Sequence, residues 1–322
     1  MQKEECIIIG GGPCGLAAAI ALEEIGKDPL VIEKENIVNA IYRFPTHQTF
    51  FSSSEKLEIG EVPFITENRK PTRNQALAYY REVVKRKKLR IQSFENVYSV
   101  EKQGSVFHLK TSKREYEAKY VILATGYYDH PNYMNIPGEN LPKVSHYFKE
   151  AHPFFDKDVV VVGGKNSSVD AALALQQAGA RVTVLYRGSE YSQHIKPWVL
   201  PEFEAMVRNG KINMIFHANL IEIKEETVVY EVKGEKNEIK NDFVFAMTGY
   251  HPNHDFLKQI GITIDVETGR PTFNEETMET NVDGAFIAGV IAAGNNANEI
   301  FIENGRFHGV LIADAIKTRE HL

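Results

Sequence analysis

The chain has 322 residues, 43% of them hydrophobic, which is enough for two domains of ordinary size. Its 37 lysines and arginines are outnumbered by 43 aspartates and glutamates, and the net charge of −6 argues against a nucleic-acid partner. Only two cysteines are present and no apolar stretch reaches membrane-spanning length, so we expect a cytoplasmic protein without a disulfide framework or a membrane contact. No metal site is predicted.

The N-terminal part of the chain predicts a strand, a glycine turn, a helix and a second strand. We expect the first strand at 6–9, the helix from about residue 12 to residue 25, and the second strand at 29–33. The turn between the first strand and the helix reads Gly10-Gly11-Gly12-Pro13-Cys14-Gly15. A glycine pattern alone is weak evidence, but in this context it is a dinucleotide-binding fingerprint.

The residues of this fingerprint each have a physical task. Gly10 permits the tight turn, Gly12 lets the backbone approach a pyrophosphate at the helix N-terminus, and Gly15 lets the helix pack against the strand. The acid that ends the second strand, Glu33, accepts hydrogen bonds from ribose hydroxyls, which suits FAD or NAD. The predicted site comprises Gly10, Gly12, Pro13, Cys14, Gly15, Glu33 and Lys34.

The stretch that follows is expected to complete this domain. Residues 34–71 are irregular and rich in aromatic and small polar groups, as the lining of a flavin ring would be. Thr72-Arg-Asn-Gln75 resembles a capping box that opens the next helix. Strands are then expected at about 94–101, 105–111 and 115–123, the last leading into Thr125-Gly126.

A second fingerprint begins in the middle of the chain. We expect a strand at 158–162, a helix at 167–178 and a strand at 181–186, which ends before Arg187. A base in this position suits the 2′-phosphate of NADP, although an exposed arginine is often only a surface charge. The predicted NADPH site comprises Gly163, Gly164, Asn166, Ser167, Arg187 and, as a weaker candidate for the same phosphate, Lys196. An acidic and a basic site in one chain indicate a flavoenzyme that NADPH reduces.

Both halves open with a glycine turn and close with Thr-Gly-Tyr, at 125–127 and 248–250, which indicates a duplication of whole domains. The last segment adds 284–289 and a final helix near residue 298. We therefore predict an α/β protein with two Rossmann-like three-layer dinucleotide-binding domains. The NADPH domain at 128–251 is inserted into a discontinuous FAD domain, 1–127 and 252–322.

The two glycine loops, both Thr-Gly segments and Thr280 with Gly284-Ala-Phe-Ile-Ala-Gly289 together resemble the low-molecular-weight thioredoxin reductase class. The resemblance covers essentially the whole chain, and it implies this inserted arrangement and a homodimer. It also implies that Thr125, Gly126 and Gly289 approach the FAD, and that the backbone of Val97 contacts the adenine.

The chain departs from that class where the chemistry occurs. Residues 148–151, Phe-Lys-Glu-Ala, stand where the Cys-x-x-Cys pair would be, so reduction of thioredoxin by the usual route is excluded. Val290 follows Gly289 where the class has an aspartate, and Lys165 and Ser168 replace glycine or alanine in the second loop.

Together with Cys14 in the first loop and the string at 189–198, these departures resemble the bacillithiol disulfide reductase family of low-GC Gram-positive bacteria. That resemblance implies NADPH-dependent reduction of a small-thiol disulfide through FAD, with Cys14 as the catalytic redox residue.

Several alternatives stay open from the sequence. Cys14 is also a small residue that fits a packed helix start, where the helix N-terminus lowers a thiol pKa and neighbouring phosphates oppose this. A ferredoxin- or flavodoxin-NADP reductase shares the fold and needs no cysteine. A non-enzymatic flavin sensor is a third interpretation, which the intact second nucleotide unit argues against. His146 is the only match to a flavin monooxygenase motif, which makes that interpretation weak.

Overall fold

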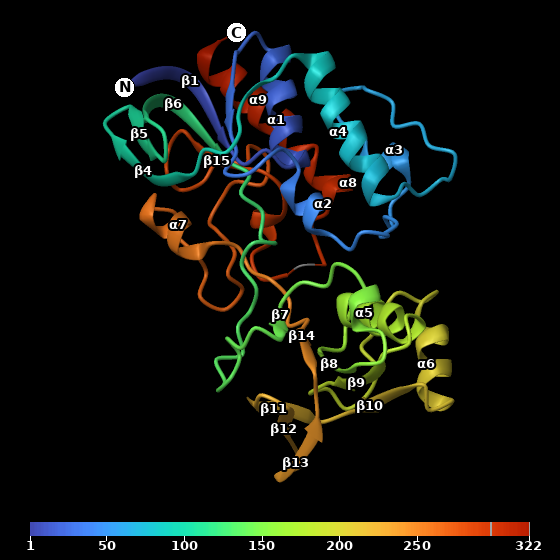
Figure 1. Ribbon diagram of the computed structural model, residues 1–322. Coiled ribbons are helices and arrows are strands. Elements are labelled where there is room, and N and C mark those ends of the chain that lie inside the picture. Colours follow the sequence, from blue (N-terminus) through green and yellow to red (C-terminus); the bar gives the residue numbers. More distant parts are fainter. Residues whose placement is uncertain (297, 322) are drawn as a thin grey trace. The chain divides into compact units, whose positions relative to one another are not determined.

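The computed structural model describes residues 1–296 and 298–321, and these form two compact units (Figure 1). The first consists of Met1–Arg43, His47–His130 and the segment from Tyr250 onward, and the second of Phe44–Thr46 and Pro131–Gly249. The chain thus leaves the first unit, forms most of the second and returns. The sequence did not indicate that Phe44–Thr46 belongs to the second unit, where the Thr46 N–H donates to the Lys149 carbonyl at 2.9 Å.

The first unit is built on one mixed sheet. Its parallel part has the order β3-β2-β1-β6-β15, and β5 and β4 add an antiparallel pair beside β6. Strand β6 changes partner along its length, because Glu115–Ala118 pairs with β5 and Val121–Leu123 with β15. The strands are β1 (Gln2–Ile9), β2 (Leu30–Ile32), β3 (Arg90–Gln92), β4 (Val97–Gln103), β5 (Val106–Thr111), β6 (Glu115–Leu123) and β15 (Ala285–Ile287).

Helices α1 (Pro13–Glu24) and α9 (His308–Glu320) lie side by side in this unit (Figure 1). They approach so closely that a Cβ on Gly309 would stand 2.5 Å from the Ala18 Cα. The capping box predicted before α4 (Arg73–Lys87) is confirmed, since Thr72 and Gln75 each accept a hydrogen bond from the backbone of the other. Shorter helices are α2 (Asn39–Arg43), α3 (Ser54–Leu57), α7 (His254–Gln259), α8 (Ile302–Gly305) and the 3-10 turn η2 (Gly289–Ala293).

Four expectations about elements were wrong in detail. The strand expected at 94–101 is β4, which runs from Val97 to Gln103. Strand β1 begins at Gln2 rather than residue 6, because its polar first half pairs with β6. The stretch 34–71 contains α2 and α3 and is not wholly irregular. The final helix begins at His308 rather than near residue 298, and the short α8 precedes it, with the Asn304 side chain accepting from the Phe301 N–H at 2.7 Å.

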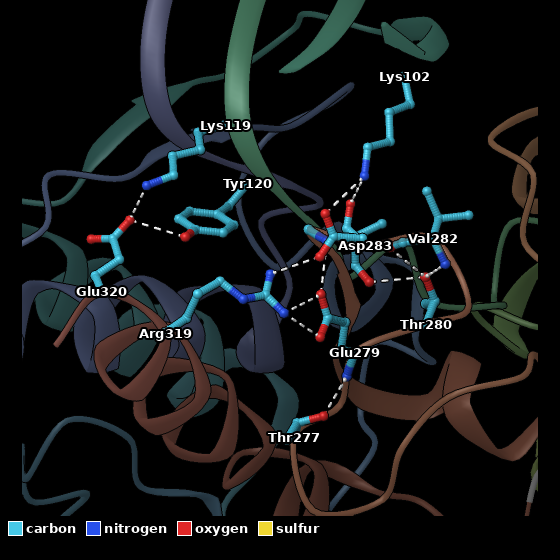
Figure 2. A network of polar contacts seen from close by, with 12 residues as sticks. Lys102, Lys119, Tyr120, Thr277, Glu279, Thr280, Val282, Asp283, Arg319 and Glu320 are labelled. Atoms are coloured by element: carbon cyan, nitrogen blue, oxygen red, sulfur yellow. Dashed lines mark hydrogen bonds and ion pairs between the residues drawn. The ribbon is translucent and has the colours of Figure 1, made fainter. Parts of the chain in front are cut away.

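The C-terminal end of α9 is tied to the rest of the first unit by ion pairs (Figure 2). The Arg319 guanidinium lies 2.6 Å from Glu279 Oε2 and 3.2 Å from Asp283 Oδ1. Glu320 accepts from Lys119, and from the Tyr120 hydroxyl at 2.9 Å. These contacts join the last helical turn to β6 and to the loop before β15.

The second unit has three layers. Its central parallel sheet has the order β10-β9-β8-β14-β7, with α5 and α6 packed on one face and a three-stranded antiparallel sheet, β11-β12-β13, on the other. The alternation along β8 decides which residues face each layer, since Val159 and Val161 face the helices and Val160 the second sheet.

The elements of this unit are β7 (Val144–Ser145), η1 (His152–Phe154), β8 (Asp158–Val162), α5 (Asn166–Gln177), β9 (Arg181–Leu185), α6 (Leu200–Arg208), β10 (Ile212–Ile215), β11 (Ala218–Ile223), β12 (Thr227–Val232), β13 (Glu235–Lys240) and β14 (Phe243–Ala246). The two Rossmann-like α/β units predicted from the sequence are therefore confirmed. Among the described residues, no helix combines the length and the apolar character needed to cross a bilayer.

Candidate functional site

The first glycine loop lies where β1 meets α1, and its glycines have different requirements. Gly10 has φ +112°, and a Cβ there would stand 2.4 Å from the Ala124 carbonyl oxygen. A Cβ on Gly15 would stand 2.0 Å from the Gly10 oxygen, so both positions require glycine. A Cβ on Gly12 would meet nothing within 4 Å. Open space at the N-terminus of α1, where helix amides point outward, fits a pyrophosphate.

Glu33 directly follows β2 beside this loop and is almost wholly buried. Its Oε2 accepts the Gly11 N–H at 2.7 Å and its Oε1 accepts the Glu35 N–H at 2.9 Å. Burial raises the pKa of this carboxyl, and the two backbone hydrogen bonds oppose that rise. Each carboxylate oxygen keeps a second lone pair for a ribose hydroxyl. The neighbouring Lys34 ammonium lies 2.8 Å from Asp129 Oδ2.

The thiol of Cys14 points away from solvent. Cβ atoms built on Gly289 and Gly305 would each stand 3.0 Å from its Sγ. Although part of the residue is exposed, burial raises the pKa of the Cys14 thiol to about 12. In the protein alone, the cost of burying the thiolate therefore sets the direction of this pKa. Cys6 is buried in β1, as expected for a core residue.

The order of the strands brings other candidate residues to the same edge of the sheet. Thr125 and Gly126 follow β6 and Gly289 follows β15, and both strands are parallel to β1. Gly126 has φ +68°, and a Cβ there would meet nothing within 4 Å. Val97 opens β4, and the segment before it runs beside Glu33, whose carbonyl accepts the Glu95 N–H at 3.0 Å.

Two neighbours of these residues were not found from the sequence. Glu95 is fully buried and accepts from the Thr111 hydroxyl at 2.6 Å and the Tyr116 hydroxyl at 3.0 Å, which fixes the chain between β3 and β4. His308 Nδ1 accepts the Gly289 N–H at 3.1 Å. Neither residue lies in a recognisable motif, so only the folded chain reveals these contacts.

The second glycine loop joins β8 to α5. Gly163 has φ +135°, and a Cβ there would stand 2.6 Å from the Met247 carbonyl oxygen. The ring of Tyr186 packs against Gly164, since a Cβ on Gly164 would stand 2.4 Å from that ring. Tyr186 directly follows β9, so both glycines are required by packing within this unit.

The unusual residues of this loop fit its geometry. The buried Ser168 hydroxyl donates to the Lys165 carbonyl at 2.7 Å within the first turn of α5. Ser167 and Arg187 are exposed, the latter two residues after the end of β9. His146, which suggested a monooxygenase motif, has its Nε2 3.5 Å from Glu139 Oε1.

Two residues of the predicted NADPH site, Lys196 and Asn166, make side-chain contacts within the protein. The Lys196 ammonium is buried and lies 2.7 Å from Asp170 Oδ2. The Asn166 side chain bonds to the backbone at His194 and at Lys196. Among the described residues, no group of three or more His, Cys, Asp or Glu side chains is arranged to hold a metal ion.

Two glycine loops at the carboxyl edges of parallel sheets, one with a buried acid and one with an exposed base, define a dinucleotide-dependent oxidoreductase. A family model described as "Pyridine nucleotide-disulphide oxidoreductase" matches residues 7–289. The chain belongs to this family, and it is an NADPH-dependent flavoprotein oxidoreductase that uses FAD.

Particular relatives are also similar over the whole chain. The chain is 71% identical to "Bacilliredoxin reductase Bdr" of Bacillus subtilis (strain 168), over 100% of both chains. It matches the solved structure "Bacillithiol Disulfide Reductase Bdr (YpdA) from Bacillus cereus" with a TM-score of 0.98 and 69% identity, over 99% of this chain and 100% of that one. A "Ferredoxin--NADP reductase" of Ignicoccus hospitalis is 28% identical over 89% of this chain and 90% of its own.

These findings confirm the predicted family resemblance, the enzyme class and the two cofactors. The family assignment favours the enzyme over a non-enzymatic flavin sensor. The ferredoxin reductase alternative rests on a distant relative.

Proposed function

We propose that the protein is an NADPH-dependent FAD disulfide reductase whose acceptor is a low-molecular-weight disulfide, most specifically bacillithiol disulfide. The observation that carries the proposal is that the chain combines two dinucleotide loops with no Cys-x-x-Cys pair. Its two cysteines are free thiols on different elements, Cys6 in β1 and Cys14 in α1. The name of the Bacillus cereus structure supports this substrate. Overall, one NADPH and one proton reduce one disulfide to two thiols.

The first unit would hold the FAD, which when bound accepts a hydride from NADPH and supplies the electrons for the disulfide. Gly12 leaves room for the pyrophosphate at the start of α1, and Glu33 accepts the ribose hydroxyls. Thr125, Gly126 and Gly289 lie at the same sheet edge and are proposed to line the cofactor. Lys34 and the backbone of Val97 are proposed to complete the adenosine side.

The second unit would hold the NADPH. Gly163 and Gly164 form the turn that admits the phosphates, with Ser167 at the exposed start of α5. The exposed Arg187 is the proposed partner of the 2′-phosphate, because a guanidinium matches a phosphate with two parallel hydrogen bonds.

A catalytic role for Cys14 is part of this proposal. The packing around the thiol means that it can react only after a local change in structure. The thiol faces Gly289 and Gly305, and its pKa is raised to about 12 by burial. Attack on a disulfide therefore requires the thiol to leave this packing and to lose its proton, because the thiolate is the nucleophile.

Anaerobic flavin absorbance tests the proposed function. NADPH should bleach the flavin faster than NADH does, and bacillithiol disulfide should then restore the oxidised spectrum. The name of the Bacillus subtilis relative points to a protein acceptor, so oxidised bacilliredoxin alone is added in a parallel sample. Reoxidation by bacilliredoxin but not by the small disulfide would contradict the proposed acceptor. Reoxidation only by ferredoxin or flavodoxin would select the alternative reductase.

We further propose that the protein works as a homodimer in the cytoplasm. The dimer is supported by the resemblance to thioredoxin reductases, and the cytoplasm by two free cysteines, which suit a reducing compartment. Sedimentation equilibrium of the FAD-loaded protein tests the dimer, and a single species of 36.4 kDa polypeptide mass would contradict it.

A further inference from the structure

The connection between β9 and α6 runs across the first turn of α5, the helix that starts at the second glycine loop. We call residues 188–199 the strap. Ile195 in its middle is buried in the core of the second unit, while the flanking His194 and Pro197 are exposed. Trp198, the chain's single tryptophan, is 60% exposed on the strap.

The Asn166 side chain forms two hydrogen bonds with the backbone of the strap. Its Nδ2 donates to the His194 carbonyl at 2.8 Å, and its Oδ1 accepts the Lys196 N–H at 3.0 Å. One amide thus uses its donor and its acceptor on both sides of Ile195. A side chain used in this way fixes the position of the strap along the helix.

Asp170 provides a third attachment, one helical turn further on. Residues four apart lie on the same face of a helix, so Asn166 and Asp170 face the strap together. The Lys196 ammonium lies 2.7 Å from Asp170 Oδ2, with the Lys196 side chain 7% exposed and that of Asp170 42% exposed. A lysine is rarely this buried unless it is paired, which makes the pair part of the structure of the strap.

These contacts occur at the helix turn to which the nucleotide phosphates would bind. Asn166 is the first residue of α5, and the strap begins directly after Arg187. The position of the strap therefore determines where Trp198, which lies on it, and Arg187, which precedes it, are placed relative to the phosphate-binding turn. Lys196 faces Asp170, which neutralises its charge, so Arg187 supplies the cation for the 2′-phosphate.

We propose that Asn166 and Asp170, the latter through Lys196, are positioning residues that hold the strap in the conformation that binds the nicotinamide dinucleotide. This inference rests on the proposed NADPH site and deepens it. It reassigns Lys196 from phosphate ligand to structural partner of Asp170. We call these contacts of Asn166 and Asp170 with the strap the clasp. Because the clasp holds the strap as a whole, it affects the binding of NADPH and NADH alike, whereas Arg187 distinguishes the two.

The test compares Asp170→Asn, Lys196→Met and the double variant in the FAD-loaded protein. We expect each to raise the KM for NADPH and for NADH by a similar factor, on the order of tenfold, with kcat nearly unchanged. The double variant should resemble the single ones, because each change breaks the same attachment. Lys224→Met is the matched control, since it breaks a half-exposed pair with Glu238 on the antiparallel sheet and should leave both KM values unchanged.

The steady-state anisotropy of Trp198 fluorescence, measured without nucleotide, reports the strap independently of activity. It should fall in the three clasp variants and stay unchanged in Lys224→Met. A lower KM for NADPH in Asp170→Asn, or an increase confined to NADPH in Lys196→Met, would identify Lys196 as a phosphate ligand and overturn the proposal. Unchanged anisotropy in the three variants would also overturn the proposal. Failure of the unaltered protein to oxidise NADPH, with anisotropy falling in the clasp variants, would instead contradict the proposed function.

Discussion

The Cys14 thiol packs against Gly289 so closely that a side chain at position 289 would clash with it. A Cβ on Gly289 would stand 2.9 Å from the Cys14 Cβ and 3.0 Å from its Sγ. Gly289 also has φ +79°, which side chains rarely adopt. The packing of the first glycine loop against the segment after β15 thus depends on a small residue at both positions.

Gly289→Ala should therefore destabilise the protein and lower its FAD content. Gly26→Ala is a matched control, because Gly26 has φ +81° but a Cβ there would meet nothing within 4 Å. Each substitution carries backbone strain of about 1–3 kcal/mol, and Gly289→Ala adds the clash with Cys14. Denaturant unfolding and the flavin-to-protein absorbance ratio measure the difference. Equal losses in the two variants would contradict the packing argument.

Cys14→Ala tests the thiol separately from the packing. We expect the variant to retain FAD and its bleaching by NADPH, because alanine fits the space, and to lose turnover of bacillithiol disulfide. In the unaltered protein, alkylation of Cys14 by iodoacetamide should rise about tenfold per pH unit between pH 7 and pH 9, below the raised pKa. Full disulfide turnover by Cys14→Ala would remove the thiol from the mechanism.

Most of the fold could be predicted from local pattern. The strand at 158–162 was placed correctly to the residue, and Gly126 and Gly249, which close the duplicated halves, both adopt positive φ. The local sequence pattern did not predict structural features that depend on a partner distant in the sequence. The polar first half of β1 is a strand only because β6 lies beside it.

The same limit applies to the candidate sites. The glycines and Glu33 are recognisable because their task is fixed by neighbours in the sequence. Lys196 suggested a phosphate ligand because it is a cation near Arg187, and only the fold brings it to Asp170, 26 residues earlier. The direction of the Cys14 pKa likewise follows from burial in the folded chain, where segments remote in sequence, such as the one around Gly305, pack near the thiol.

Glu33→Gln should weaken FAD binding and change its dependence on pH. Burial raises the pKa of Glu33, so the carboxylate becomes protonated at a higher pH than an ordinary glutamate. A protonated carboxyl accepts ribose hydroxyls less well, and FAD affinity should therefore fall as the pH is lowered through this raised pKa. Titration of the apoprotein with FAD between pH 4.5 and pH 8 measures this. The glutamine variant should show lower affinity and a flatter profile, and an unchanged profile would argue against Glu33 as the ribose acceptor.

Arg187→Ala should change the choice between the nicotinamide cofactors. Loss of the guanidinium removes the partner of the 2′-phosphate, which NADH lacks, so the KM for NADPH should rise about tenfold or more and that for NADH should not. Arg208→Ala, at the exposed end of α6, is the control for loss of one positive charge. Equal changes in the two KM values would mean that Arg187 helps to position the strap and does not bind the 2′-phosphate.

Glu320→Gln should loosen the last turn of α9 in a pH-dependent manner (Figure 2). Burial disfavours the charged form of Glu320, but hydrogen bonds from Lys119, Lys27 and Tyr120 outweigh it and lower the pKa to about 2. A carboxyl whose pKa is lower in the folded chain than in the unfolded chain stabilises the fold above its unfolded pKa. That stabilisation is lost as the pH falls from about 4.5 towards 2.

The unaltered protein should therefore unfold at a higher denaturant concentration than Glu320→Gln at pH 7, and this gap should narrow as the pH is lowered through that interval. Glu276→Gln, an exposed acid whose carboxylate takes no part in this network, should show no gap at either pH. The absence of a gap at pH 7 would mean that Glu320 contributes by shape and hydrogen bonding rather than by its charge, since glutamine preserves its shape and an acceptor oxygen.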